Sequence, residues 1–344
     1  MCRPKCWPMS SAVAEARVTH ITETYQFMEV DKDHRIERRA DRSLLSADFE
    51  GWPAYRLREG DLELAIVPSV GGRLMNIEFR GTSISFVNAN LKGRVARFDP
   101  VEWAGLCDAK WPFPLWGGSK TWIAPESEWP GGAPHRDLDS GAYRVVRTWC
   151  DVASMGIELE SPVCSDSELQ ISRCIEVKAG STTWRTLHRI TNRGPRVRAC
   201  GVWDVSMFRR PATVEIEVDA GFSSTHDVIL PVEGHGHFAD IHDTGIVSLR
   251  DRTASVACER PDTFKVGVAH ASGTIQIAFA GRDGEVHQYR RIANVERDAR
   301  YAHGAAVEIF NSQDLPYFEV ESHSPLIDLQ PGQHIEFEIV ERFE

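Results

Sequence analysis

The sequence has no run of about 18 or more apolar residues, so no segment predicts a transmembrane helix. It also lacks an excess of basic residues, because 39 Lys and Arg stand against 50 Asp and Glu, and the formal net charge is −11. A chain this acidic is not expected to bind nucleic acid through a broad basic surface or to dock on anionic lipid. The composition therefore predicts neither a nucleic-acid-binding nor a membrane-bound protein.

Paired cysteine motifs are scarce as well. Eight cysteines are spread over 344 residues, and only Cys2 and Cys6 lie close together. Residues 1–11 contain two basic side chains but no apolar stretch follows them, so a secretory signal is not evident. We therefore expect a cytoplasmic protein with free thiols rather than a disulfide framework. The dispersed spacing also gives no zinc signature.

Amphipathic helical stripes are few, and alternation of apolar and polar residues dominates from about Gly51 onward. Turn signals with Gly, Asn or Pro separate most of the alternating runs. Short turns between consecutive strands predict antiparallel pairing, and the lack of a fixed-period repeat disfavours a propeller. The sequence thus predicts an all-β protein, a large antiparallel β-sandwich. The predicted strands cover 62–66, 74–79, 83–87, 143–151, 155–159, 169–177, 182–191, 196–208, 212–218, 246–249, 255–258, 264–270, 274–279, 306–310, 317–322 and 335–340.

Two units follow from this pattern. Residues 1–42 form a predicted N-terminal extension, which is dense in charge between Glu29 and Arg42 and is interpreted as a solvated arm or short helix. No internal linker stands out after it. Residues 43–344 are therefore predicted to form a single sandwich domain.

One candidate site is the segment 111–132, which is too rich in Pro and Gly to predict a regular element. It holds four Trp, one Lys and two Glu, and loops of this kind often line a site on a rigid sheet. Tryptophan stacks on a sugar ring, while Lys120 and Glu126 bond hydroxyl or carboxylate groups. The alternative interpretation is an apolar loop that plugs one end of the sandwich.

The segment 318–326 carries the second candidate. Glu319 and Glu321 share one face of a strand because side chains alternate, and His323 follows in the same register. Two carboxylates on one face can share a proton or divide acid and base roles. The alternative is a solvated polar face, the usual place of Glu in an antiparallel strand.

A third segment, 233–243, contains His235, His237 and His242 with two Asp, a composition that can bind a divalent metal. No second cluster of matching type accompanies it, so we do not expect a bound metal. No organic cofactor is expected either. The sequence has no dinucleotide fingerprint, P-loop or nucleophile elbow. Nucleotide cofactors and serine-hydrolase chemistry are therefore unsupported.

Taken in order, several segments resemble the galactose mutarotase (aldose 1-epimerase) superfamily, and most closely an uncharacterised mutarotase-like branch. The family's Leu-His-Gly-Gly loop resembles Leu115 to Gly118, and its catalytic Glu with the later Leu-x-Pro-Gly resembles Glu319 or Glu321 and then Leu329 to Gly332. The other similar segments are Pro68 to Arg73, Gly117 to Pro125, Thr182 to Asn192 and Val202 to Phe208.

The resemblance implies a supersandwich fold with a carbohydrate site on its concave face. In the family enzymes a Glu takes the proton from the anomeric hydroxyl, and a His protonates the ring oxygen so that the ring opens. Here Trp116 stands at the first family His, and Trp203 or Asp204 at the second. Neither Trp can transfer a proton as imidazole does.

Because both family His positions are changed, the sequence does not identify the residue that protonates the ring oxygen. The expected base is Glu321 or Glu319, and the candidate replacements for the lost imidazole are Asp204, His188 and His323. Arg73 and Lys120 together would suit an acidic sugar or a sugar phosphate. The run from Gln288 to Arg291 either adds to this basic group or forms an edge strand. The expected substrate-binding residues are Arg73, Trp116, Lys120, Trp122, Glu126 and Trp203.

The first functional hypothesis is accordingly a mutarotase-like isomerase that acts on a free or acidic sugar, with a small-molecule sugar as its partner. The alternatives are a non-catalytic carbohydrate-binding protein, or a lyase or hydrolase on the same fold. An isomerase needs a carboxylate and a proton donor across one pocket, whereas a binding protein needs only stacking and hydrogen bonds.

Overall fold

The computed structural model describes residues 42–108, 110–232, 241–282 and 284–344. These residues belong to one compact unit. The predicted extension, apart from Arg42, lies outside the described residues and stays a prediction. Regular structure begins at Arg42 with the strand β1, which the sequence pattern did not predict.

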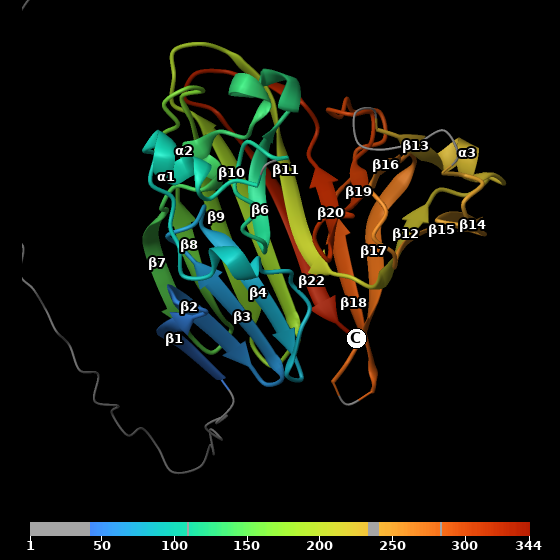
Figure 1. The fold of residues 1–344 in the computed structure, drawn as a ribbon, viewed down its shortest axis with the longest axis horizontal. Helices are drawn as coiled ribbons and strands as arrows, with labels where there is room; N and C mark the ends of the chain where they lie inside the picture. Colours follow the sequence, from blue (N-terminus) through green and yellow to red (C-terminus); the bar gives the residue numbers. More distant parts are fainter. Residues whose placement is uncertain (1–41, 109, 233–240, 283) are drawn as a thin grey trace, which may run out of the picture. The chain divides into compact units, whose positions relative to one another are not determined.

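Two large antiparallel sheets make up the described chain, and they face each other as layers (Figure 1). The predicted all-β sandwich is confirmed. In spatial order the 12-stranded sheet contains β1 (Arg42–Phe49), β2 (Trp52–Glu59), β3 (Leu62–Val67), β4 (Arg73–Phe79), β6 (Ser119–Ala124), β11 (Arg198–Arg209), β20 (Tyr317–His323), β19 (Val307–Asn311), β16 (Phe264–Val268) and β13 (Ile229–Pro231), with β5 (Thr82–Ser83) beside β4 and β21 (Ile327–Leu329) beside β11. The 10-stranded sheet contains β14 (Val247–Arg250), β15 (Thr253–Cys258), β12 (Ala212–Val218), β17 (Ala271–Ala280), β18 (Val286–Ala293), β22 (His334–Phe343), β10 (Thr183–Asn192), β9 (Leu169–Lys178), β8 (Ser154–Glu160) and β7 (Arg144–Cys150).

The helices that the structure describes are short and lie in the connections between strands. They are α1 (Pro100–Ala104), α2 (Arg136–Asp139), α3 (Thr225–Val228) and the single-turn helices η1 (Ala89–Leu91), η2 (Glu126–Glu128) and η3 (Pro130–Gly132). Within the described ranges, none has the length and apolar character needed to cross a membrane. Figure 1 shows α1 and α2 near one end of the strands, and α2 contacts β6.

Alternating burial explains why most strands were predicted. In β12, for example, Val214, Ile216 and Val218 are buried in the core while the residues between them are more exposed. This is the pattern of a sheet that buries one face and leaves the other partly in water.

One prediction about local structure is wrong. Ser119–Ala124, within the segment expected to be irregular, forms the central strand β6, and all six of its residues are buried. Its burial on both faces erases the alternation that marks a half-exposed strand. The preceding Gly117 and Gly118 have positive φ, and a Cβ would lie 2.2 Å from the Phe86 carbonyl oxygen and 2.6 Å from that of Leu74. Only glycine fits this entry into β6.

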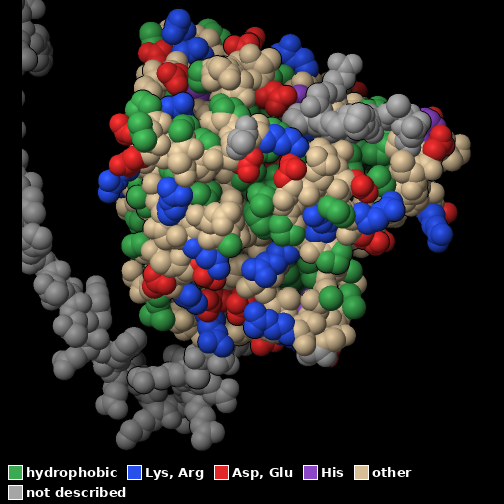
Figure 2. Space-filling model, in the orientation of Figure 1, with side chains coloured by type: hydrophobic (Ala, Val, Ile, Leu, Met, Phe, Trp, Pro, Cys, Tyr) green, Lys and Arg blue, Asp and Glu red, His purple; other side chains and the backbone are tan. Residues whose placement is uncertain are grey.

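The basic run Gln288–Arg291 fits neither of its two predicted roles. It belongs to β18, which is paired on both sides, with β17 and β22, and is not an edge strand. Arg291 is 1% exposed and points between the sheets, so it adds nothing to a surface basic group. On the face that Figure 2 shows, Lys and Arg side chains are interspersed with Asp and Glu.

Candidate functional site

Register places the site on one face of three neighbouring strands. Trp203 of β11 lies opposite Trp122 of β6 on one side and His323 of β20 on the other. One row further along, Val205 lies between Lys120 and Glu321. Because side chains alternate along a strand, these rows share a face.

A cavity of about 370 Å³ opens on this face, a size within the range of small-molecule sites. Its wall is mostly aromatic and its polar groups are few. The lining residues are Trp111, Phe113, Leu115, Trp122, Glu126, Ser127, Trp129, Gly132, Trp203, Lys265, Phe310, Tyr317, Glu319 and Glu321. The cavity thus unites both predicted candidates, the tryptophan-rich segment and the carboxylates of β20.

Three indoles form one packed wall. The Trp122 ring centroid lies 5.0 Å from that of Trp129 and 5.2 Å from that of Trp203, both in edge-on geometry. Trp129 and Trp203 stack at 5.4 Å. The Trp129 indole N–H donates to the Ile123 carbonyl at 2.7 Å, which fixes the ring at the cavity edge. Such a wall presents flat apolar faces of the kind that pack on a sugar ring.

The two carboxylates of β20 form ion pairs with two different lysines. The Lys120 ammonium donates to Glu319 Oε1 at 3.0 Å and lies 4.0 Å from the Trp122 ring centre. The Lys265 ammonium donates to Glu321 Oε2 at 2.9 Å, and the Trp203 indole N–H donates to the same oxygen at 2.7 Å. Both donors reach Oε2, so Oε1 is the oxygen of Glu321 left to carry a proton.

Lys265 is shared between Glu321 and a third carboxylate, Glu308. Its ammonium also lies 2.9 Å from Glu308 Oε2. Burial raises the pKa of Glu321, as do the Glu308 and Glu319 charges, and despite Lys265 the pKa reaches about 8. The pKa of Glu308 lies well below its ordinary value, because Lys265 and the neighbouring imidazoles outweigh its burial. The two pKa shifts have opposite directions, so Glu321 is the carboxyl of this pair that more readily holds a proton in the cavity wall.

This proton gives a pH-dependence of stability. Folded Glu321 keeps its proton up to about pH 8, whereas an unfolded Glu loses it near pH 4.3. Between these values the folded state binds more protons, so rising pH lowers the free energy of unfolding. We expect stability to fall between about pH 5 and about pH 8, with much of this slope absent in Glu321→Gln. Urea unfolding of both proteins at several pH values measures it. Equal slopes in the two proteins would contradict a raised pKa.

Two histidines lie behind the cavity around Glu308. His303 Nδ1 is 2.7 Å from Glu308 Oε1, and His323 Nε2 is 3.3 Å from Glu308 Oε2. Three such ligand atoms could in principle hold a cation, but the Lys265 ammonium already occupies the cationic position beside Glu308. Burial lowers the pKa of His323, whose ring stacks on Trp203. His323 does not line the cavity, so its predicted acid role lacks direct access to a substrate.

Asp204 and His188 lie on the opposite face of β11, between the two sheets. Asp204 pairs with Arg291, and its Oδ1 is 3.2 Å from His188 Nε2. Burial raises the pKa of Asp204, but Arg291 outweighs it and the net pKa is lowered. Burial lowers the pKa of His188 to about 3. Neither residue lines the cavity, because the two faces of one strand point in opposite directions. The structure therefore gives no support to their predicted acid role.

Three of the six predicted binding residues, Arg73, Trp116 and Lys120, do not line the cavity. Arg73 and Trp116 are buried behind it. Arg73 is 1% exposed, and its guanidinium lies 2.7 Å from Asp139 Oδ1, which also accepts the Trp122 indole N–H at 2.7 Å. Trp116 is fully buried and donates to the Ser140 hydroxyl at 2.9 Å. Both residues support Trp122 or its surroundings and do not line the cavity.

The predicted histidine cluster lies mostly outside the described residues, since only His242 of His235, His237 and His242 is described. The His242 ring stacks on His226 with centroids 3.8 Å apart, and its Nδ1 lies 3.0 Å from the Thr225 hydroxyl.

Lys265, Glu308 and His303 were not among the residues predicted for the site. A lysine within the apolar run of β16 and a glutamate within that of β19 were the available signals. A charged residue buried in such a run needs a partner of opposite charge. Here Lys265 pairs with Glu308 and Glu321, which lie on other strands of the same sheet.

The sequence matches no family model and no curated protein. Solved structures, in contrast, match over most of the chain. A galactose mutarotase-like protein from Clostridium acetobutylicum gives a TM-score of 0.53 at 12% identity, covering 88% of this chain and 99% of that chain. A galactose mutarotase-like protein from Lactobacillus casei gives 0.53 at 8% identity, covering 85% and 100%. A galactose mutarotase related enzyme from Lactobacillus acidophilus gives 0.51 at 9% identity, covering 85% and 97%.

At these identities the similarity establishes the fold. The described chain has the galactose mutarotase-like fold, which confirms at that level the resemblance seen in the sequence. Activity and substrate have to be argued from the cavity itself.

Proposed function

We propose that this protein is a mutarotase-like isomerase of free aldoses that works with two carboxyl groups and no imidazole in direct contact with the sugar. One observation carries the proposal: Glu319 and Glu321 line the same aromatic cavity. Burial and the neighbouring carboxylates raise the pKa of Glu321, which suits it to the role of the acid. A pair of carboxyl groups in different protonation states supplies both a base and an acid.

The reaction needs two coupled proton transfers. Glu319 accepts the proton of the anomeric hydroxyl, Glu321 donates its proton to the ring oxygen, and the bond from that oxygen to the anomeric carbon breaks. Rotation of the resulting aldehyde presents its other face. On closure Glu321 takes back the proton of the hydroxyl and Glu319 returns its proton to the new anomeric oxygen. Both residues then have their starting protonation states, and no other reactant is consumed.

The charges of the site favour a neutral sugar. Lys120 and Lys265 are each bonded to carboxylates, and Arg73 is paired with Asp139 behind the Trp122 ring. The basic groups predicted to bind an acidic sugar are therefore already neutralised. A second anionic group in the cavity would lie beside Glu319 without a dedicated cation. Neutral hexoses or pentoses are thus the proposed substrates, rather than uronic acids or sugar phosphates.

Exchange NMR between the two anomers tests this function on a panel of neutral aldoses, uronic acids and sugar phosphates. We expect faster exchange than in buffer for at least one neutral aldose. Binding without acceleration would instead establish the alternative of a carbohydrate-binding protein, which the indole wall also suits. Cleavage of a glycosidic bond in the same samples would establish the lyase or hydrolase alternative.

We also propose a cytoplasmic location. The six described cysteines, Cys107, Cys150, Cys164, Cys174, Cys200 and Cys258, are all free thiols. Unpaired thiols in this number suit a reducing compartment.

A further inference from the structure

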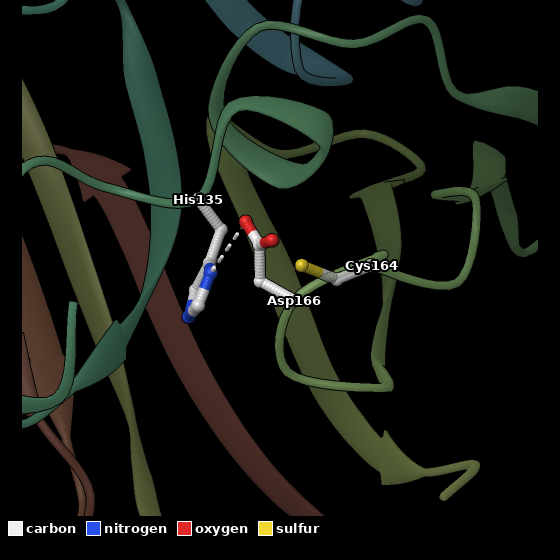
Figure 3. Close-up of side chains that lie close together, drawn as sticks. All are labelled: His135, Cys164 and Asp166. Atoms are coloured by element: carbon white, nitrogen blue, oxygen red, sulfur yellow. Dashed lines mark ion pairs between the residues drawn. The ribbon is translucent and has the colours of Figure 1, made fainter. Parts of the chain in front are cut away.

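A mixed cluster of potential metal ligands lies outside the sugar cavity. One ligand atom each from His135, Cys164 and Asp166 lies within 4.8 Å of the others. Figure 3 shows the three side chains converging from two segments of the chain. We propose that they form a binding site for a divalent, thiophilic cation of the zinc class.

Local structure holds the two segments together. His135 immediately precedes α2, while Cys164 and Asp166 lie in the connection between β8 and β9. Asp137 of α2 accepts hydrogen bonds from both the backbone N–H and the hydroxyl of Ser165, at 2.9 and 2.8 Å. The backbone N–H of Cys164 donates to the Leu169 carbonyl at 2.8 Å. The ligand-bearing positions are therefore fixed next to each other without help from a cation.

The imidazole of His135 gives a second observation that points to a bound cation. The residue is 7% exposed, and its Nδ1 has no hydrogen-bond partner among the described residues. The nearest carboxylate oxygen, Asp166 Oδ2, is 4.0 Å away, which is too long for a hydrogen bond. A buried polar atom without a partner costs free energy. A cation between His135 and Asp166 would satisfy this nitrogen.

The donor set selects the kind of cation. A thiolate, an imidazole and a carboxylate together suit Zn²⁺ and related borderline metals, whereas Mg²⁺ and Ca²⁺ prefer oxygen alone. Zinc–ligand bonds of about 2.0–2.3 Å require the three ligand atoms to approach one another slightly. Asp166 can do so, because its side chain is 58% exposed. Binding would release the Cys164 thiol proton to solvent.

The cavity beside the three ligands leaves room for a fourth ligand of the cation, and its wall carries negative charge that would stabilise the cation. His135 and Asp166 line a separate cavity of about 330 Å³, which can supply a water ligand. Arg198 lines it too, but its guanidinium lies 3.3 Å from Glu168 Oε2. Glu128 adds a further carboxyl group to the wall. The cation would therefore not face an unpaired positive charge.

Cobalt(II) titration of the tag-free full chain tests the site, since a thiolate-bound cobalt ion gives a charge-transfer band in the near ultraviolet. We expect one equivalent to produce this band and zinc to displace it. Cys164→Ser should abolish the band, and Asp166→Asn should weaken binding about tenfold or more. The matched controls are Cys200→Ser, a buried thiol lining the same cavity, and Asp328→Asn, an exposed carboxylate on β21.

No thiolate band in the parent protein would overturn the proposal. An unchanged band in folded Cys164→Ser, or unchanged affinity in Asp166→Asn, would assign the cation elsewhere and overturn it as well. The exposed Asp166 keeps the test decisive even where Cys164→Ser fails to fold. The optical readout requires no sugar turnover, so its result is independent of the proposed isomerase activity.

Discussion

Glu321→Gln is expected to slow anomer exchange by about 10²–10⁴-fold, the usual contribution of a positioned proton-transfer group. The amide keeps the size of the side chain and an oxygen that accepts from Trp203 and Lys265, but it has no acidic proton to give. Lys265 retains Glu308 as its ion-pair partner at 2.9 Å. The variant should therefore fold and bind sugar while losing turnover.

The measurement is exchange NMR at saturating sugar, with binding followed by the fluorescence of the tryptophan wall. Glu338→Gln is the matched control, because Glu338 of β22 does not line the cavity and pairs at 2.9 Å with Arg185 of β10, on the 10-stranded sheet. Its exchange rate should equal that of the parent protein. A parent-like rate in Glu321→Gln would remove Glu321 from the reaction, whatever the control shows.

Glu319→Gln tests the proposed base, but its effects on turnover and on stability are harder to separate. Its carboxylate is the group bonded to Lys120, a lysine whose pKa burial lowers. Loss of that charge leaves a buried ammonium without its nearest counter-charge, so stability and turnover would fall together. Glu321, which shares Lys265 with Glu308, is for this reason the more informative position.

The sequence predicted the sandwich because most strands bury only one face. In strands such as β12 and β17, apolar and polar residues alternate along the sequence, so the pattern is visible without the structure. The carboxylates of β20 were found for the same reason, since residues two apart in a strand share a face. These are local rules, and they hold before any tertiary contact is known.

The remaining features depend on contacts between distant segments. β6 and β11 are buried on both faces, so alternation cannot say which residues of β11 meet the cavity and which meet the second sheet. The prediction placed Asp204 in the site together with Trp203, although neighbours in a strand point to opposite sides. Lys265 and Glu308 come from other strands, and only the order β20-β19-β16 brings them to Glu321.

Asp204→Ala is expected to lower the free energy of unfolding by about 3–5 kcal/mol, the usual cost of breaking a buried ion pair from one side. Arg291 is 1% exposed and would keep its charge, with Glu341, 3.5 Å away, as its remaining ion-pair partner among the described residues. Asp219→Ala provides the contrast, because it removes the partly exposed partner of Arg297, whose side chain is 78% exposed, and should cost about 0–1 kcal/mol.

Urea unfolding of the three proteins measures these differences, and exchange NMR at a temperature where Asp204→Ala remains folded separates structure from catalysis. A residue that acts only between the sheets should leave the turnover of the folded fraction close to that of the parent protein. A loss of turnover as large as that of Glu321→Gln, with little loss of stability, would instead restore Asp204 as the acid. The face of β11 on which Asp204 lies favours the first result, because its carboxylate is already committed to Arg291 and lies 3.2 Å from His188.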